Sequence, residues 1–96
     1  MRTPCVYMMG NERNGTIYTG VTSDLSRRAY EHRQKLVRGF TSRYGCTRLL
    51  WYEYYERMQD AIAREKQIKA GPRKQKLELI EALNPQWRDL YEELAR

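Results

Sequence analysis

Residues 5–20 contain two short apolar runs separated by a polar turn, and this pattern limits the fold more than any other in the chain. The runs are CVYMM, over residues 5–9, and TIYT, over residues 16–19. The six residues between them end in Asn14-Gly15, a pair that supplies the positive φ values of tight hairpin turns. The stretch therefore predicts two antiparallel strands joined by a turn.

Further elements follow the hairpin in an alternating order. Thr22, Ser23 and Asp24 offer N-cap side chains for a helix, and Gly71-Pro72 separates two later helices. The chain is thus expected to form a small sheet with helices packed on it. The predicted elements are a helix over residues 25–37, a loop over 39–47, a strand over 49–54, and helices over 58–70, 73–83 and 85–94.

The length of 96 residues is that of one domain, so we expect a single unit over residues 1–96. No apolar stretch reaches the roughly 20 residues that a membrane helix needs. Charged and turn residues interrupt the N-terminus before a signal-peptide core forms, and a cytoplasmic protein is expected. Cys5 and Cys46 match no metal-ligand spacing, so they are predicted to be free thiols, without a zinc site.

The net charge of +6 comes from the first half of the chain. Residues 1–52 carry nine basic residues against three acidic ones, whereas residues 53–96 carry nine of each. Within the second half, residues 64–76 hold six basic residues against Glu65 alone. Such clusters fit a polyanion, nucleic acid before membrane, because no segment pairs a broad apolar face with the basic one. On charge alone, a basic face that is merely solvated is the alternative.

Glu65 interrupts the apolar stripe of the helix expected over residues 58–70. On a helical wheel Met58, Ala61, Ile62 and Ile68 fall on one side, and Glu65 falls in the middle of them. An ionised carboxylate in that position is costly unless it is paired or bound to a metal. Glu65 is therefore expected either to form an ion pair at the edge of the sheet or to act as a metal ligand or catalytic acid in a cleft.

Arg28 and His32 lie one helical turn apart, on one face of the helix expected over residues 25–37. Leu25, Ala29 and Leu36 form the apolar stripe of this helix, with His32 inside the stripe and Arg28 at its border. Such a histidine is either a satisfied structural residue or part of a catalytic site. Phosphodiester chemistry uses a guanidinium, a proton shuttle and a metal-binding carboxylate together, which favours catalysis once the misplaced glutamate is considered.

Two tyrosines occupy the predicted hairpin. Alternation on the first strand puts Tyr7 on the face opposite Val6 and Met8. In one register of the hairpin Tyr7 and Tyr18 share a face of adjacent strands, close enough for both hydroxyls to reach one centre. Each tyrosine on its own is equally well explained as a core aromatic, and together with the other residues the two phenols are candidates for a catalytic base.

An ordered set of motifs resembles the GIY-YIG nuclease superfamily. The motifs are CVY at residues 5–7, YTG at 18–20, DLSRRAYEH at 24–32, AIAREKQIK at 61–69 and the tail NPQWRDLYEEL. The chain is most similar to the small standalone branch, which resembles the N-terminal nuclease domain of excinuclease ABC. Cys5 stands where the family usually has glycine. The resemblance implies an α/β (α+β) fold with a three-stranded antiparallel sheet flanked by helices, in the order β-β-α-β-α-α-α.

The resemblance also implies a catalytic set. Tyr7 and Tyr18 match the tyrosines of the two half-motifs, Arg28 matches the helix arginine, and His32 matches the residue one turn later. Glu65 matches the glutamate that holds a single divalent ion, Mg²⁺ or alternatively Mn²⁺, for which one carboxylate is sufficient protein ligation. The implied activity is metal-dependent endonucleolytic hydrolysis of phosphodiester bonds, with DNA favoured over RNA.

Within this set, Tyr7 is expected to activate the water, with Tyr18 and His32 positioning it or sharing the proton, and these assignments are exchangeable. A phenol is a poor base at neutral pH, so neighbouring cations are expected to lower the pKa of Tyr7. Asn84 is the candidate for the family's late asparagine. Its place before Pro85 is equally well explained by helix capping, and it is left out of the catalytic set.

A basic and aromatic set is expected to hold the substrate through phosphate contacts and stacking. Its members are Arg38, Phe40, Arg43, Tyr44, Lys66, Lys69, Arg73 and Lys74. Selection of the substrate is expected to depend on nucleic-acid structure or on a protein partner that targets it, and the excinuclease likeness suggests DNA repair. Two alternatives are a nucleic-acid-binding module with little or no chemistry and an interaction domain whose basic face meets acidic proteins.

Overall fold

The central strand of the sheet is β1, Cys5–Gly10, in the computed structural model, which describes residues 2–94. It pairs antiparallel with β2 (Ile17–Thr22) on one side and with β3 (Arg48–Tyr54) on the other. Every residue of β1 is buried, which explains why its sequence is apolar throughout instead of alternating. The three-stranded antiparallel sheet implied by the family resemblance is confirmed.

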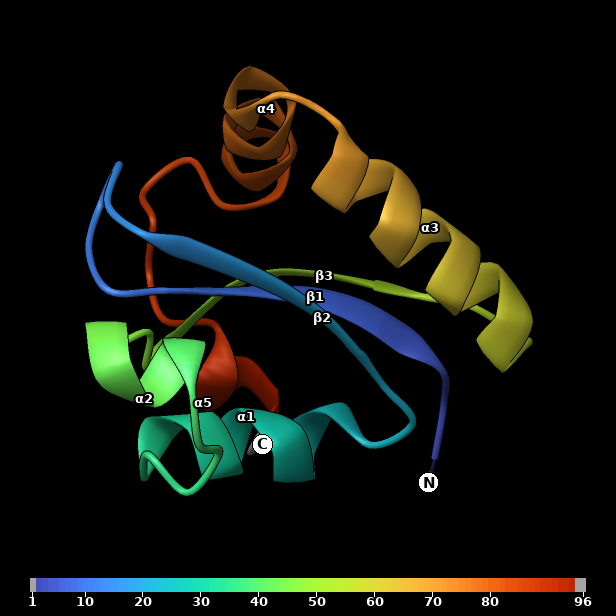
Figure 1. Ribbon diagram of the computed structural model, residues 1–96, viewed down its shortest axis with the longest axis horizontal. Helices are drawn as coiled ribbons and strands as arrows, with labels where there is room; N and C mark the ends of the chain where they lie inside the picture. Colours follow the sequence, from blue (N-terminus) through green and yellow to red (C-terminus); the bar gives the residue numbers. More distant parts are fainter. Residues whose placement is uncertain (1, 95–96) are drawn as a thin grey trace.

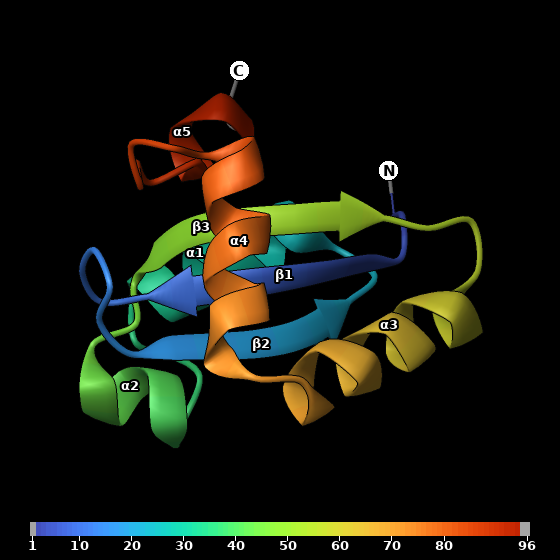
Figure 2. The same cartoon turned by 90° about the horizontal axis from the view of Figure 1, so that it is seen from above.

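Helices cover both faces of this sheet (Figure 1). On one face lie α1 (Leu25–Arg33), α2 (Phe40–Tyr44) and α5 (Tyr91–Leu94), and on the other lie α3 (Met58–Ala70) and α4 (Arg73–Leu83). In Figure 2, α4 crosses the sheet and α3 lies beside β2. This position of α3 allows side chains from the second layer of helices to reach around the edge of the sheet.

Two hydrophobic clusters, one for each face, separate the side chains of β1 by alternation. Cys5, Tyr7 and Met9 belong to the cluster that contains Leu25 and Ala29 of α1. Val6 and Met8 belong to the cluster with α3 and α4, together with Ala61, Ile68 and Ile80. The predicted assignment of these strand residues to opposite faces is confirmed, and Tyr7 faces α1.

The hairpin turn differs from the prediction in its backbone. Asn14 has the positive φ of 57°, but Gly15 is not among the residues with positive φ. A side chain at residue 15 would instead collide with Asn11, since a Cβ there would lie 2.2 Å from Asn11 Oδ1. That oxygen accepts a hydrogen bond from Thr16 N at 2.9 Å. Gly15 is therefore required for space and not for its φ angle.

Helix α1 begins as predicted but ends at Arg33, short of the expected residue 37. Asp24 caps its start by accepting a hydrogen bond from Arg27 N at 3.2 Å. At its end Lys35 adopts a left-handed φ of 57°, and Leu36 N donates to Glu31 O at 2.8 Å. These contacts form a Schellman-type cap. Leu36, which was expected in the apolar stripe, consequently lies beyond the helix and is 64% exposed.

Two further segments differ from the prediction. Phe40–Tyr44, predicted as loop, forms the short helix α2 between Gly39 and Gly45, and it adds one helix to the predicted order of elements. The last helix, predicted over residues 85–94, covers only Tyr91–Leu94. The residues before it are held otherwise: Trp87 is buried with a φ of 56°, and Leu90 N donates to Leu49 O of β3 at 2.7 Å.

Both cysteines are buried and unpaired, which confirms the prediction of free thiols. Burial raises the pKa of the Cys5 thiol to about 12 and also raises the pKa of Cys46. Both groups are therefore protonated at neutral pH. Within residues 2–94, no helix combines the length and apolar character that crossing a membrane requires.

Candidate active site

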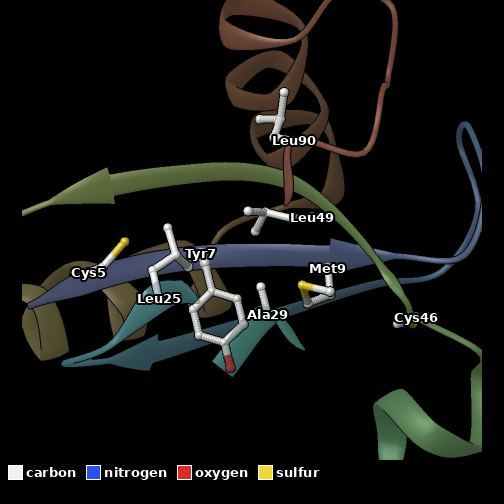
Figure 3. Packing of buried hydrophobic residues seen from close by; sticks show 8 residues of the cluster. All are labelled: Cys5, Tyr7, Met9, Leu25, Ala29, Cys46, Leu49 and Leu90. Carbon is white, nitrogen blue, oxygen red and sulfur yellow. The ribbon is translucent and has the colours of Figure 1, made fainter. Parts of the chain in front are cut away.

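The two hairpin tyrosines lie together on the face of the sheet covered by α1. In the β1–β2 register Tyr7 is opposite Gly20 and Met9 is opposite Tyr18, so both phenols project to the same side. Their ring centroids are 6.3 Å apart. Figure 3 shows the Tyr7 ring extending from β1 toward α1, beside Ala29. The predicted register, with both tyrosines on one face, is confirmed.

Gly20 makes room for the Tyr7 phenol. A Cβ at residue 20 would lie 2.6 Å from Tyr7 Oη, 2.7 Å from Tyr7 Cζ and 2.9 Å from Tyr18 Cε2. These contacts are much shorter than van der Waals distances, and they involve the ring of a buried side chain. The last residue of the second half-motif therefore has a steric role in the site, which the sequence did not reveal.

His32 is buried between the tyrosines and is hydrogen-bonded on both ring nitrogens. Its Nε2 lies 2.8 Å from Tyr7 Oη, and its Nδ1 lies 3.0 Å from Thr41 Oγ1 of α2. Its ring centroid is 5.5 Å from that of Tyr7 and 5.6 Å from that of Tyr18. Burial, together with the charge of Arg28, lowers the pKa of His32 to about 4. The imidazole is therefore neutral at physiological pH, with one nitrogen as donor and one as acceptor.

The expectation that cations lower the pKa of Tyr7 is wrong for this structure. Burial of the phenol raises its pKa, with a further contribution from Tyr18, and the opposing effect of Arg28 is smaller. The physical reason is that Tyr7 is only 1% exposed, so its phenolate would lose most of its hydration. Tyr7 is thus a protonated phenol whose oxygen contacts a neutral imidazole.

Arg28 of α1 borders the tyrosines and is ion-paired on its own helix. Its Nη1 lies 3.1 Å from Glu31 Oε1, and Arg27 Nε lies 3.3 Å from the other oxygen of the same carboxylate. These pairs lower the pKa of Glu31, with Arg28 as the largest cause. Burial opposes the charge of Arg28, but hydrogen bonds to Tyr7 and Glu31 leave its pKa raised. Glu31 was missed from the sequence, although its spacing of three residues from Arg28 marks a helical neighbour.

Glu65 reaches the same region from α3. Its side chain is 15% exposed, and its Oε2 is 3.2 Å from Lys69 Nζ. Lys69 Nζ in turn lies 5.7 Å from the centroid of the Tyr18 ring, and the charge of Glu65 contributes to the raised pKa of Tyr7. The carboxylate therefore lies at the rim of the site in an ion pair, not in the middle of an apolar face. Ile62, predicted on that face, is 37% exposed.

The oxygen donor of Glu65 fits a single hard cation such as Mg²⁺. Residues 2–94 contain no group of three or more His, Cys, Asp or Glu side chains that could hold a metal ion. Mg²⁺ is usually bound by one or two carboxylates, with water and substrate phosphate as its other ligands. The partly exposed carboxylate of Glu65 suits this mode if Lys69, which is 48% exposed, turns toward solvent.

Four of the predicted substrate-binding residues adjoin the tyrosines. Phe40 of α2 packs 6.1 Å from Tyr18, and Tyr44 packs 4.8 Å from Phe40, measured between ring centroids. Arg43 lies 5.5 Å above the Tyr44 ring, and Lys69 lies over Tyr18 from the other side. Phe40 and Tyr44 are 46% and 45% exposed. They therefore continue the site as an exposed aromatic row from Tyr18.

The other predicted substrate-binding residues are spread over the surface. Arg38, Lys66 and Lys74 are exposed, on the α1–α2 loop, α3 and α4 respectively. Arg73 has a structural contact that the sequence did not indicate, since its Nη2 donates to Asn14 O at 2.8 Å and to Gly15 O at 2.6 Å. It thereby fastens the start of α4 to the hairpin turn.

Asn84 is used by the backbone around it. It is buried, and its Nδ2 donates to Leu50 O at 3.2 Å and to Arg88 O at 2.7 Å. Its Oδ1 accepts from Arg88 N at 3.0 Å. These hydrogen bonds hold the turn after α4 against β3, which is a structural role consistent with leaving Asn84 out of the catalytic set.

Comparison with known proteins agrees with the geometry of the two tyrosines, the arginine, the histidine and the glutamate. The GIY-YIG catalytic domain matches residues 3–78. The chain belongs to the GIY-YIG family. Nucleases of this family generally depend on a divalent metal and act on nucleic acid, so the chain has a nuclease-type fold.

Curated relatives of similar size extend this match. A UPF0213 protein of Clostridium perfringens is 34% identical over 68 residues, which cover 71% of this chain and 73% of the relative. A UPF0213 protein of Staphylococcus aureus is 33% identical over 67 residues, covering 70% of this chain and 82% of the relative. Their names state no activity. No solved structure matches the chain significantly.

Proposed function

We propose that this protein is a divalent-metal-dependent endonuclease that hydrolyses phosphodiester bonds in nucleic acid, with DNA as the favoured substrate. The observation that carries the proposal is the hydrogen bond of 2.8 Å between the buried Tyr7 phenol and the neutral His32 imidazole. Arg28 lies beside this pair, and Glu65 lies across the Tyr18 ring from α2. A proton acceptor, a cation for the phosphate and a metal-binding carboxylate thus meet at one place.

The protonated state of Tyr7 favours a relay over a preformed phenolate. As a water molecule attacks phosphorus, its proton passes to Tyr7 Oη while the Tyr7 proton passes to His32 Nε2. The water O–H bond breaks, the new O–P bond forms, and the bond from phosphorus to the 3′-oxygen breaks. The imidazolium formed on His32 later returns its proton by the same route, and the leaving oxygen takes a proton from solvent. Such proton transfer typically contributes roughly 10²–10⁴-fold to the rate.

Arg28 supplies positive charge where the phosphate becomes more negative. Its guanidinium is 40% exposed on its outer side and interacts with the Tyr7 oxygen on its inner side. Glu31 holds it in place from the same helix. Glu65 would hold one Mg²⁺ or Mn²⁺ ion, which when bound would neutralise phosphate charge and stabilise the leaving oxygen.

The aromatic row of Tyr18, Phe40 and Tyr44 supports substrate holding next to the catalytic residues. Stacking of a base on an aromatic side chain is worth about 1–3 kcal/mol. Arg43 and Lys69 border this row and would contact the adjacent phosphates. The proposed binding surface therefore lies along α2, continuous with the site.

The experiment that tests the proposal is nicking of supercoiled DNA in Mg²⁺, in Mn²⁺ and with chelator. Wild type should nick only with metal. Glu65→Ala and Arg28→Ala should each lose roughly 10²-fold or more in rate, whereas Glu56→Ala, which removes an exposed carboxylate before α3, should match wild type. Equal activity of wild type, Glu65→Ala and Arg28→Ala would refute the catalytic assignment.

The ion pair between Glu65 and Lys69 supports a second candidate, a nucleic-acid-binding module on the same fold. In that case the carboxylate is already neutralised by a protein cation. This candidate predicts salt-sensitive binding that survives Glu65→Ala, and no cleavage product even in Mn²⁺.

A further inference from the structure

Thr41 ends a buried row of hydrogen bonds that begins at the catalytic tyrosine. The row runs from Tyr7 Oη to His32 Nε2 at 2.8 Å and from His32 Nδ1 to Thr41 Oγ1 at 3.0 Å. Tyr7, His32 and Thr41 are 1%, 1% and 3% exposed. No buried side-chain nitrogen or oxygen in the described part of the chain lacks a partner. Each nitrogen of the His32 ring therefore depends on one of these two neighbours.

The direction of the row follows from what each group is able to donate. Arg28 carries donors and no acceptor, so its interaction with the Tyr7 oxygen uses that oxygen as an acceptor. The Tyr7 proton then points to His32. Because burial and Arg28 keep the imidazole neutral, it has one N–H and one acceptor nitrogen. Nε2 accepts from Tyr7, and the N–H on Nδ1 donates to Thr41.

We infer that Thr41 is a positioning residue, whose hydroxyl oxygen holds the proton of His32 on Nδ1 and so keeps Nε2 open to accept the proton of Tyr7. Its consequence for catalysis rests on the proposed nuclease function, whereas the tautomer is a property of the resting protein. In the reaction the Tyr7 O–H bond breaks as the Nε2–H bond forms, and the proton of water replaces the one that Tyr7 has lost. The resulting imidazolium donates from both nitrogens, to Tyr7 and to Thr41.

Loss of the Thr41 hydroxyl removes the acceptor for Nδ1–H. The imidazole proton then gains more by moving to Nε2, where it donates to the Tyr7 oxygen. In that tautomer Nε2 has no lone pair for the Tyr7 proton, and the relay is blocked. Thr41 lies on α2 beside Phe40 and Arg43, so the helix that carries the proposed binding surface also sets the state of the proton acceptor.

The first test is nitrogen-15 NMR of the imidazole in untagged, resting protein, without metal or DNA. His32 is the one histidine in the sequence, so the spectrum reports a single ring. Wild type should be protonated on Nδ1 and unprotonated on Nε2. Thr41→Val, which keeps the shape of the side chain, should shift the proton toward Nε2, and Thr41→Ser should restore the wild-type pattern. Protonation of Nε2 in wild type would overturn the inference, even if Thr41→Val did not fold.

The second test is the rate of DNA nicking at saturating and at limiting substrate. Thr41→Val should lower kcat by roughly 10- to 100-fold with little change in KM, the usual cost of removing a group that orients a histidine. Thr41→Ser should recover most of kcat. The matched control is Thr19→Val, which removes a buried hydroxyl from the neighbouring strand β2 and should leave kcat unchanged. Wild-type kcat in Thr41→Val would refute the positioning role, whereas inactivity of wild type with the expected NMR pattern would count against the nuclease function alone.

Discussion

The substitution Gly20→Ala should expel the Tyr7 phenol from its place in the site. The added methyl group would lie 2.6 Å from Tyr7 Oη and 2.7 Å from Tyr7 Cζ, so the ring must rotate or the strands must separate. Overpacking of a buried site costs about 1–3 kcal/mol. Loss of the hydrogen bond between Tyr7 and His32 leaves buried polar groups unpaired and costs about 1–3 kcal/mol more.

The assay for this prediction is the free energy of unfolding in urea, with the melting temperature as a second measure. For a domain of this size, a loss of about 3 kcal/mol lowers Tm by roughly 12–24 °C. Gly71→Ala is the matched control, because its added Cβ would meet mainly the mobile end of Gln75. It should change stability by less than about 1 kcal/mol.

A double-mutant cycle identifies the cause. In a Tyr7→Leu background the large ring and the hydroxyl are gone, so Gly20→Ala should cost much less than it does in wild type. An equal cost in both backgrounds would show that the damage does not come from the clash with Tyr7. A cost below about 0.5 kcal/mol in wild type, within the range of ordinary surface substitutions, would refute the steric reasoning altogether.

Three further predictions concern pH, salt and the hairpin turn. The folded pKa of His32, about 4, lies below its ordinary value of 6.5, so the unfolded chain binds the extra proton between these values, and stability should fall by up to about 3 kcal/mol as pH drops through that window. His32→Gln should flatten this part of the urea-stability profile, and identical slopes would contradict the burial argument. If about five phosphates are engaged, log affinity for duplex DNA should fall with log salt at a slope of roughly −4 to −5, and Arg43→Ala should reduce that slope by about one. A slope near zero in wild type would exclude the basic surface as the binding site. Arg73→Ala should lower the free energy of unfolding by about 1 kcal/mol, because two hydrogen bonds to the carbonyls of Asn14 and Gly15 are lost, and unchanged stability in urea would argue against the clamp.

Local patterns in the sequence were sufficient for the scaffold. Apolar runs around a turn predicted the hairpin and put both tyrosines on one face, because side chains alternate along a strand. The spacing of four residues predicted that Arg28 and His32 share a face of α1. A charged residue inside an apolar stripe marked Glu65 as unusual, although the buried stripe of α3 excludes Ile62. These features depend on geometry within one element, which the spacing of residues fixes.

Ends of elements and the short helix were predicted less well. The left-handed turn at Lys35 ends α1 early, and α2 has only five residues, too few for a periodic pattern to appear. The last helix is shortened because Leu90 pairs with the backbone of Leu49 and Asn84 holds the turn after α4. In each case contacts between segments distant in the sequence override the local preference.

The sequence by itself determined which residue types come together, namely two phenols, a guanidinium, an imidazole and a carboxylate, because strand alternation and helical spacing are local. Only the tertiary structure decided their chemical states. Burial between the sheet and α1 raises the pKa of Tyr7 and keeps His32 neutral, and packing of α2 brings Thr41 to the imidazole. These states depend on desolvation and on partners from other elements, and no spacing along a single element reveals either.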